Sequence, residues 1–171
     1  MKISEEFDAI IGFAREEAMR TGDFSIHADH LFLGLLRHRD NEAVRKLLEA
    51  GIEPATCKSY VESFLFRKEA VPYSMAEEVR LHRSAENAVN MAIAEAMREG
   101  AEEAGSIHLL RAICKQESCY SGMYLRRTKL PGMLEKAPKK KNSPATNSPE
   151  VSAEQMSRLF ATIKINNTIP S

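Results

Sequence analysis

The sequence of this chain repeats itself when it is displaced by 78 residues. Under this single shift Glu17-Ala18-Met19-Arg20 aligns with Glu95-Ala96-Met97-Arg98, and no gap is needed anywhere between residues 14 and 31. Further identical pairs under the same shift are Ala14/Ala92, Gly22/Gly100, His30/His108 and Leu31/Leu109. A repeat at one fixed period indicates a duplicated structural unit. The chain is therefore predicted to fold as two copies of one unit.

The first copy has the pattern of four helices within the first 66 residues. Ser4 is a good N-cap, and Glu5 and Glu6 follow in the first turn, where the helix dipole favours acids. Apolar residues then recur at helical spacing, and Gly22 favours the end of the helix. Three further helices are predicted: one buried on most sides over residues 30–37, one over 41–50, and one that begins near Pro54.

The second copy is predicted to be less complete than the first. Ser74 and Glu77 have the spacing of a capping box, which predicts a long helix from there to Gly100. Another helix is expected to start at Ser106. The third and fourth helices would fall within residues 121–136, where Pro131-Gly132 interrupts the pattern, so they are expected to be short. The predicted fold is all-α, with two pseudo-symmetric four-helix repeats, the second degenerate at its C-terminal end.

Composition sets the expected boundaries. The double-repeat domain is placed at residues 1–136, with repeat one at 3–66 and repeat two at 73–136. Residues 137–150 are rich in Lys, Pro, Ser and Asn and are predicted to be a disordered linker. Residues 151–171 form a tail whose weakly amphipathic part, 151–165, is either a short docking helix or simply an unstructured end.

Charge is unevenly distributed along a chain whose net charge is zero. Residues 136–171 carry a net charge of +4, and residues 1–135 carry −4. An acidic body offers no electrostatic reason to bind nucleic acid, and the three lysines at 139–141 fit a solvated linker. No nucleic-acid partner is expected.

The chain shows no sign of a membrane or secretory protein. No apolar run approaches the about 18 to 20 residues that span a bilayer, and the first ten residues lack the pattern of a signal peptide. Cys57, Cys114 and Cys119 match no common metal or redox spacing and are expected to be reduced and buried. We expect a cytoplasmic protein without membrane contact.

The two copies resemble the N-terminal repeat domain of Clp ATPases. The first copy reads FAREEAMRTGDFSIHADHLFLGLL and the second MAIAEAMREGAEEAGSIHLLRAI, both with E-A-x-x-x-G, a short loop, and x-H-[IL] before an apolar helix. The resemblance covers about residues 3–135. It implies a pseudo-twofold all-α domain at the entrance of protein-unfolding AAA+ machines, where it binds substrates or adaptor proteins. The chain has no G-x-x-x-x-G-K-[ST] motif, so no ATPase is expected in it.

The resemblance also suggests a candidate ligand site. Some family members bind phosphorylated arginine through a hydroxyl residue at the start of the first helix and an acid just before the loop histidine. Ser4 and Asp29 match these positions in repeat one. In repeat two the acid is replaced by Ile107, and the hydroxyl position falls on His82 by strict spacing or on Ser74 if the helix is longer. At most one such site is therefore expected.

The remaining candidates favour structural roles. His30 and His108 occupy the same position in both repeats, and we interpret them as helix-start side chains that bond the loop backbone, with Gly22 and Gly100 as helix ends. His27 and His30 lie near Asp23 and Asp29, but the loop has no Cys and repeat two has Gly105 in place of His27, so no metal is expected. No nucleophile is paired with a base, which predicts a protein that is not an enzyme and needs no cofactor.

The leading functional hypothesis is a non-catalytic recognition domain of the Clp protein-quality-control system. It would bind substrate segments or adaptor proteins, or dock on a Clp ATPase or protease subunit, through a groove between the repeats or the exposed faces of the first and fourth helices. The alternative is a binding module unrelated to Clp machines, recruited to its partner through the C-terminal tail.

Overall fold

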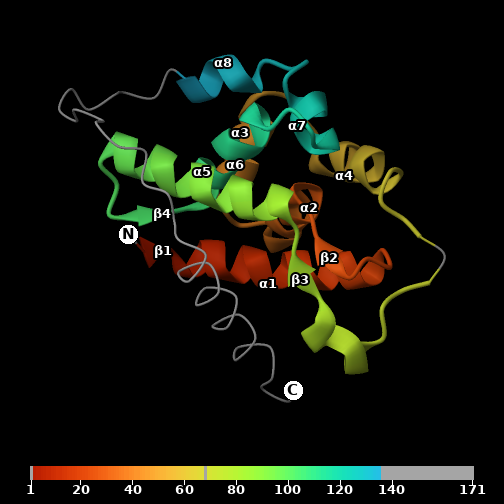
Figure 1. Ribbon diagram of the computed structural model, residues 1–171. Helices are drawn as coiled ribbons and strands as arrows, with labels where there is room; N and C mark the ends of the chain where they lie inside the picture. Colours follow the sequence, from red (N-terminus) through yellow and green to blue (C-terminus); the bar gives the residue numbers. More distant parts are fainter. Residues whose placement is uncertain (1, 68, 136–171) are drawn as a thin grey trace.

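The computed structural model describes residues 2–67 and 69–135 of the chain (Figure 1). The predicted linker and tail, 137–171, lie outside the described residues. The elements of repeat one are β1 (Lys2–Ile3), α1 (Glu5–Arg20), β2 (Ser25–Ile26), α2 (Ala28–His38), α3 (Glu42–Glu49) and α4 (Pro54–Glu62). After a 3₁₀ helix, η1 (Tyr73–Glu78), the elements of repeat two are β3 (Arg80–Leu81), α5 (Arg83–Glu99), β4 (Glu103–Ala104), α6 (Ser106–Lys115), α7 (Tyr120–Leu125) and α8 (Leu130–Glu135).

The two repeats have the same order of elements, in agreement with the sequence repeat. A shift of 78 residues places α1 on α5, α2 on α6 and α3 on α7, and it also places β1 on β3 and β2 on β4. The predicted all-α double repeat is therefore confirmed. The two-residue strands were not predicted, because a segment of two residues is too short to show the alternation by which strands are recognised.

The strands join the repeats to each other. β1 of repeat one pairs in parallel with β4 of repeat two, and β2 of repeat one pairs in parallel with β3 of repeat two. One pair lies at the start of α1 and the end of α5, and the other at the end of α1 and the start of α5 (Figure 1). Each repeat therefore contributes one strand to each pair, and the repeats are tied together at both ends.

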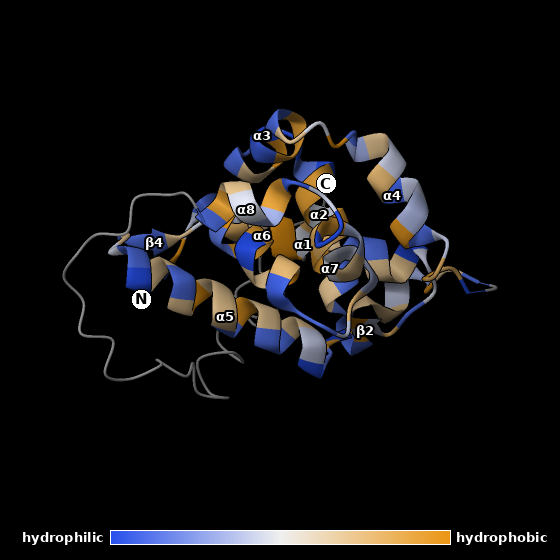
Figure 2. Ribbon diagram, turned by 90° about the horizontal axis from the view of Figure 1, so that it is seen from above, coloured by the Kyte–Doolittle hydropathy of each residue, from blue (hydrophilic) through white to orange (hydrophobic). Residues whose placement is uncertain are grey.

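One apolar core runs through both repeats. Its largest fully buried side chains come from α1, α2 and α6 together with β2, and Figure 2 shows the strongly apolar positions of α1, α2 and α6 gathered in the middle of the molecule. They are Phe7, Ile10, Ile11, Ile26, Leu31, Phe32, Leu33, Leu35, Leu109, Leu110 and Ile113, with Leu47 of α3. Because this core is shared, neither repeat buries its apolar face alone.

The start of repeat two differs from the prediction. The Ser74/Glu77 capping box does not begin a long helix; residues 73–78 form η1, in which no side chain caps the helix start. The chain then extends from Val79 to His82 to pair with β2, and α5 begins at Arg83 with His82 as its N-cap. Burial of Val79 and the pairing of β3 override the local helix signal. Strict spacing is therefore the right alignment, and His82, not Ser74, is the counterpart of Ser4.

The last two helices of repeat two are short, as predicted. α7 and α8 have six residues each, against eight and nine in α3 and α4. Pro131-Gly132 does not separate them, however, because both residues lie inside α8. Pro131 occupies the first turn, where a backbone N–H would have no acceptor within the helix, so a proline is tolerated there. Within the described residues no helix is long and apolar enough to cross a membrane.

The close approach of α1 and α2 depends on Gly34. A Cβ atom built on Gly34 would lie 2.5 Å from the carbonyl oxygen of Ile10 and 2.7 Å from the amide nitrogen of Ala14. Both atoms belong to the backbone of α1, which cannot move without disturbing the helix. The equivalent position in repeat two is Ala112, so this approach is particular to the first helix pair.

We expect Gly34→Ala to destabilise the protein by about 1–3 kcal/mol, because the added methyl group overpacks a rigid backbone contact. The matched control is Gly132→Ala in α8, where a Cβ would meet nothing within 4 Å. The control should be neutral or stabilise by up to about 1 kcal/mol through helix propensity. Urea unfolding followed by circular dichroism measures both changes, and equal effects of the two variants would contradict the packing argument.

Candidate functional site

His30 links the start of α2 to the end of α1. Its Nδ1 accepts a hydrogen bond of 2.9 Å from the backbone amide of His27, so Nδ1 carries no proton. Nε2 lies 3.1 Å from Oγ1 of Thr21, whose hydroxyl also lies 2.9 Å from the carbonyl oxygen of Glu17. Nε2–H therefore donates to Thr21, and the Thr21 hydroxyl donates to Glu17. Complete burial lowers the pKa of His30 to about 4, which keeps the ring neutral.

His108 makes the equivalent link in repeat two. Its Nδ1 accepts from the backbone amide of Gly105 at 2.9 Å, and its Nε2 bonds the carboxylate of Glu99. Glu99 stands where repeat one has Thr21. Burial favours the neutral form of Glu99, but the bonds from His108 and Arg111 outweigh it and lower the pKa of that carboxyl. The two histidines thus share a geometry and differ in the hydrogen-bond partner of Nε2, which is Thr21 for His30 and Glu99 for His108.

Gly22 and Gly100 lie where α1 and α5 end. Their φ angles are +84° and +77°, in the left-handed region that glycine adopts without strain. In each repeat the glycine turns the chain toward the loop that carries the histidine. These four motif residues therefore lie at corresponding positions of the two helix hairpins.

Ser4 caps α1 and lies beside the start of α6. Its Oγ accepts from the amide of Phe7 at 3.0 Å, and its own amide donates to the carbonyl oxygen of Ala104 at 2.9 Å. The first amide of α6, from Ser106, donates to the carboxylate of Glu6 at 3.1 Å. The anion-binding position at this helix start is therefore filled by a carboxylate of the chain itself.

Asp29 binds the start of α7. Its Oδ1 accepts from the amide of Ser121 at 2.8 Å and from the Ser121 hydroxyl at 2.7 Å, and its Oδ2 accepts from the amide of Tyr120 at 3.2 Å. Asp29 is buried. Ala43 is the counterpart of Ser121 in repeat one, and its amide donates to the Ser106 hydroxyl at 3.2 Å. Asp29 thus accepts hydrogen bonds from amides at the start of α7, as Ser106 does at the start of α3.

The structure does not bring Ser4 and Asp29 together. They lie at the starts of α1 and α2, so Ser4 precedes one end of α1 and Asp29 follows the other end of this helix, which is about 24 Å long. The side of α2 that carries Asp29 faces repeat two instead, where the Ser84 hydroxyl accepts from the amide of Ala28 at 3.0 Å. A site that needs Ser4 and Asp29 next to each other does not fit this arrangement, and a ligand-binding role of either residue stays a prediction.

Two histidines stack at this helix start. The rings of His27 and His82 lie 4.1 Å apart with an interplanar angle of 28°. His27 Nε2 lies 3.2 Å from a carboxylate oxygen of Asp23, but desolvation by burial outweighs that charge and lowers the pKa of His27. Among residues 2–67 and 69–135 no three His, Cys, Asp or Glu side chains gather in a group that could hold a metal ion. All three cysteines are free and buried, as predicted.

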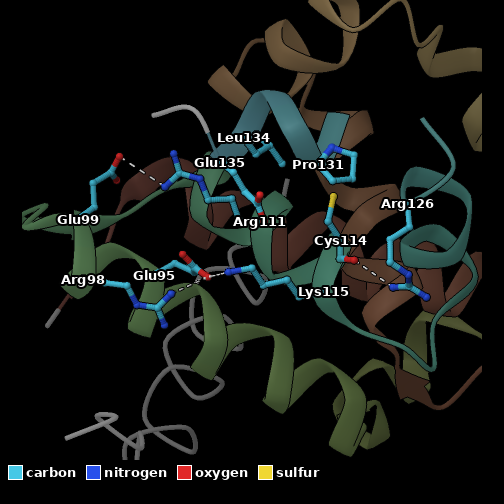
Figure 3. A pocket seen from close by; sticks show the side chains of 10 residues that line it. All are labelled: Glu95, Arg98, Glu99, Arg111, Cys114, Lys115, Arg126, Pro131, Leu134 and Glu135. Atoms are coloured by element: carbon cyan, nitrogen blue, oxygen red, sulfur yellow. Dashed lines mark hydrogen bonds and ion pairs between the residues drawn. The ribbon is translucent and has the colours of Figure 1, made fainter. Parts of the chain in front are cut away.

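A groove with charged walls opens between α5, α6 and α8, and sequence reasoning missed it (Figure 3). Its volume is about 650 Å³. Its lining combines acidic and basic side chains with the apolar residues Cys114, Pro131 and Leu134. The lining residues are Glu95, Arg98, Glu99, Arg111, Cys114, Lys115, Arg126, Pro131, Leu134 and Glu135.

Ion pairs hold the groove walls. Glu95 binds Lys115 of α6 and lies 3.4 Å from Arg98, and Glu99 lies 3.4 Å from Arg111 (Figure 3). Repeat one has the same charges at the equivalent positions 17, 20 and 37, so a sequence comparison of the repeats could have identified the acid and its two bases. The remaining walls come from α8, whose position cannot be read from the repeat pattern.

The thiol of Cys114 belongs to the groove lining. Burial raises the pKa of the Cys114 thiol to about 12, so at neutral pH the sulfur is protonated and unreactive. The Nε atom of Arg111 is buried and has no hydrogen-bond partner among the described residues. A lining of charged and apolar side chains suits a polypeptide segment of mixed polarity.

We expect Asp29→Ala to destabilise the protein by about 1–3 kcal/mol, because it removes the acceptor of two amides and one hydroxyl at a buried helix start. Asp29→Asn, which keeps one oxygen, should recover part of the loss. The control Asp40→Ala removes an exposed acid paired with Arg45 and should cost about 0–1 kcal/mol. Urea unfolding and hydrogen exchange at the Ser121 amide measure the effect; unchanged stability would show that these hydrogen bonds do not stabilise the fold.

The pKa of His30 predicts a pH dependence. Because the native pKa of about 4 lies below the unfolded value of 6.5, the unfolded chain takes up the proton first. The contribution of neutral His30 is therefore complete above about pH 6.5 and falls by about 3 kcal/mol as the pH drops to 4. His30→Asn retains an acceptor near the Nδ1 position and does not titrate. The difference in unfolding free energy between wild type and variant should follow this slope; parallel curves would exclude it.

Three comparisons place the chain among known proteins. The model of the family "Clp repeat (R) N-terminal domain" matches residues 2–128. The negative regulator of genetic competence ClpC/MecB of Bacillus subtilis (strain 168) and the chaperone protein ClpB of Oceanobacillus iheyensis are each 24% identical to it over 115 residues, which are 67% of this chain and 14% of the relative. The chain therefore spans only a small part of the length of these curated relatives.

A solved structure has the same fold. The N-terminal domain of the caseinolytic protease associated chaperone ClpD from Arabidopsis thaliana aligns with a TM-score of 0.58 at 20% sequence identity, over 74% of this chain and 86% of that chain. The family match covers repeat one and repeat two as far as the end of α7, a range that includes positions 22, 30, 100 and 108. The chain belongs to the Clp repeat N-terminal domain family.

Proposed function

We propose that this chain is a non-catalytic protein-binding domain of the Clp chaperone and protease system, which recognises substrate segments or adaptor proteins or docks on a Clp ATPase or protease subunit. The observation that carries the proposal is the family match over residues 2–128, which includes both repeats. N-terminal repeat domains of Clp ATPases are protein-binding domains, and two relatives of this chain are ClpC/MecB and ClpB proteins.

The groove of repeat two supports binding of a polypeptide. A chain in extended conformation exposes side chains of both polarities, and the groove offers the Lys115 and Arg98 cations and the apolar side chain of Leu134. Arginine is enriched where proteins bind each other. The high pKa of Cys114 argues against a covalent step in the groove. These properties favour reversible capture over chemistry.

The groove predicts which side chains of this domain contribute to binding of the partner. We expect the double variant Arg98→Ala, Lys115→Ala to weaken partner binding at least about tenfold, because both cations line the groove rim with side chains that are 57% and 45% exposed. The matched control is Arg45→Ala, Lys46→Ala on α3, which removes two cations with side chains 60% and 36% exposed that are not among the lining residues. Circular dichroism and thermal melting show whether each variant is folded.

The measurement is capture by tagged full-length protein in the source cell, with mass spectrometry of the retained proteins. Retention of Clp ATPase or protease subunits supports the proposal. Retention of one unrelated partner that is lost on deletion of 137–171 would favour the alternative, a module recruited through its tail. Binding of Clp subunits that is equal in the groove variant and the α3 control would keep the Clp assignment and remove the groove from it.

A further inference from the structure

Four aromatic rings form an exposed cluster where α4 of repeat one meets α7 of repeat two. This aromatic patch consists of Tyr60, Phe64, Tyr120 and Tyr124. Phe64 stacks on Tyr120 with centroids 4.3 Å apart and an interplanar angle of 7°, and Tyr60 lies 5.1 Å from Phe64 and 5.0 Å from Tyr124. Tyr60, Phe64 and Tyr120 remain 37–47% exposed. The rings therefore hold one another in place and still present apolar surface to solvent.

The fold itself does not require aromatic side chains at these positions. Under the 78-residue shift, Tyr120 and Tyr124 of α7 correspond to two charged residues of α3, the exposed Glu42 and the half-buried Lys46. Met123, 41% exposed on α7, corresponds to Arg45. The same surface of the equivalent helix is thus charged in one repeat and apolar in the other. An exposed cluster of large apolar side chains that the fold does not need indicates a contact surface.

The edge of the patch is basic. Beside Tyr124, a hollow of about 710 Å³ lies between residues 50–56 and 124–129, and Arg127 and Lys129 line it. Neither Arg127 nor Lys129 forms an ion pair with another described residue, whereas Lys58 on α4 lies 3.8 Å from Glu62. Glu53 is the acidic side chain among the residues that line the hollow. The charge next to the aromatic rings is therefore positive and available to a partner.

From these observations we infer that the aromatic patch binds a partner protein segment in which aromatic or large aliphatic side chains are flanked by Asp or Glu. The apolar side chains would pack on the rings, and the acids would pair with Arg127 and Lys129. The inference rests on the proposed function, since it names the chemistry of one partner of a protein-binding domain, and it uses a surface separate from the groove.

Charge favours an acidic partner segment over the chain's own residues 136–171 and over a second copy of the chain. The chain's own residues 136–171 carry six Lys or Arg against two Asp or Glu, so they would bring like charge to Arg127 and Lys129. A second copy placed patch to patch by a twofold axis would oppose each cation with a cation. A foreign acidic segment meets neither obstacle.

The test uses two synthetic dodecapeptides, one in which Phe and Leu alternate with pairs of Glu, and one with every Glu replaced by Lys. Isotope-labelled full-length protein is titrated with each at low salt and followed by NMR. The acidic peptide should shift the amides of α4 and α7 and bind at least about tenfold more tightly than the basic one. Arg127→Glu combined with Lys129→Glu should abolish or reverse that preference.

Variants of the patch separate binding from stability. Phe64→Ala with Tyr120→Ala removes the stacked pair and should weaken binding at least about tenfold. Met123→Glu leaves all four rings in place and should also weaken it, which covers the case in which the ring variant does not fold. Arg45→Ala with Lys46→Ala on the equivalent surface of α3 is the matched control and should bind as wild type does.

Four results would overturn the inference: shifts confined to the groove, equal affinity for both peptides, dimers in sedimentation that dissociate on Met123→Glu, or acidic-peptide affinity that rises when residues 136–171 are deleted. The last two would assign the patch to a second copy or to the chain's own tail. If the wild-type protein does not bind the acidic peptide but the Met123→Glu variant still retains Clp subunits, the inference about the patch is wrong. The proposed function would then remain intact.

Discussion

Buried amides at helix starts are the constraint on which this fold depends. The first amides of a helix have no partner within it, and a buried amide without a partner costs free energy. Here four helix starts are capped by side chains of the other repeat: Ala28 by Ser84, Ser106 by Glu6, Ala43 by Ser106, and Ser121 by Asp29. The strand pair β1–β4 directly precedes the starts of α1 and α6, and the pair β2–β3 directly precedes the starts of α2 and α5. The repeats are therefore joined by polar contacts as well as by a common core.

This exchange of caps determines which polar residues remain for function. Asp29 has the position and charge that a ligand site would need, yet its two oxygens already accept three hydrogen bonds from Tyr120 and Ser121. Glu6 fills the equivalent place at α6. A ligand that used either acid would have to break contacts that hold the repeats together. New binding surfaces are therefore expected from side chains that cap no helix start, as in the groove of repeat two and the aromatic patch.

The repeat made most of the fold predictable, and what it could not predict has physical causes. The 78-residue shift gave the element order and the positions of His30 and His108, because helix periodicity and a repeated motif are local signals. The capping box at Ser74 predicted a helix start that the structure does not have. A capping box is also a local signal, and the burial of Val79 and the pairing of β3 with β2 outweighed this one. The partners of Asp29 lie 91 and 92 residues further along the chain. No spacing rule connects residues across that distance.

The candidate surfaces were less predictable because they arise where the repeats differ. The motif residues identified from the sequence are the ones common to both copies, and common residues serve the hairpin geometry that both copies share. Tyr120 and Tyr124 stand at positions where α3 has Glu42 and Lys46, so a search for identities passes over them. In a duplicated domain, shared positions report on folding, and an apolar residue that replaces a charged one on the surface reports on binding. Comparing the repeats for such replacements would have found the α7 half of the aromatic patch from the sequence; only the folded chain shows that α4 supplies the other half.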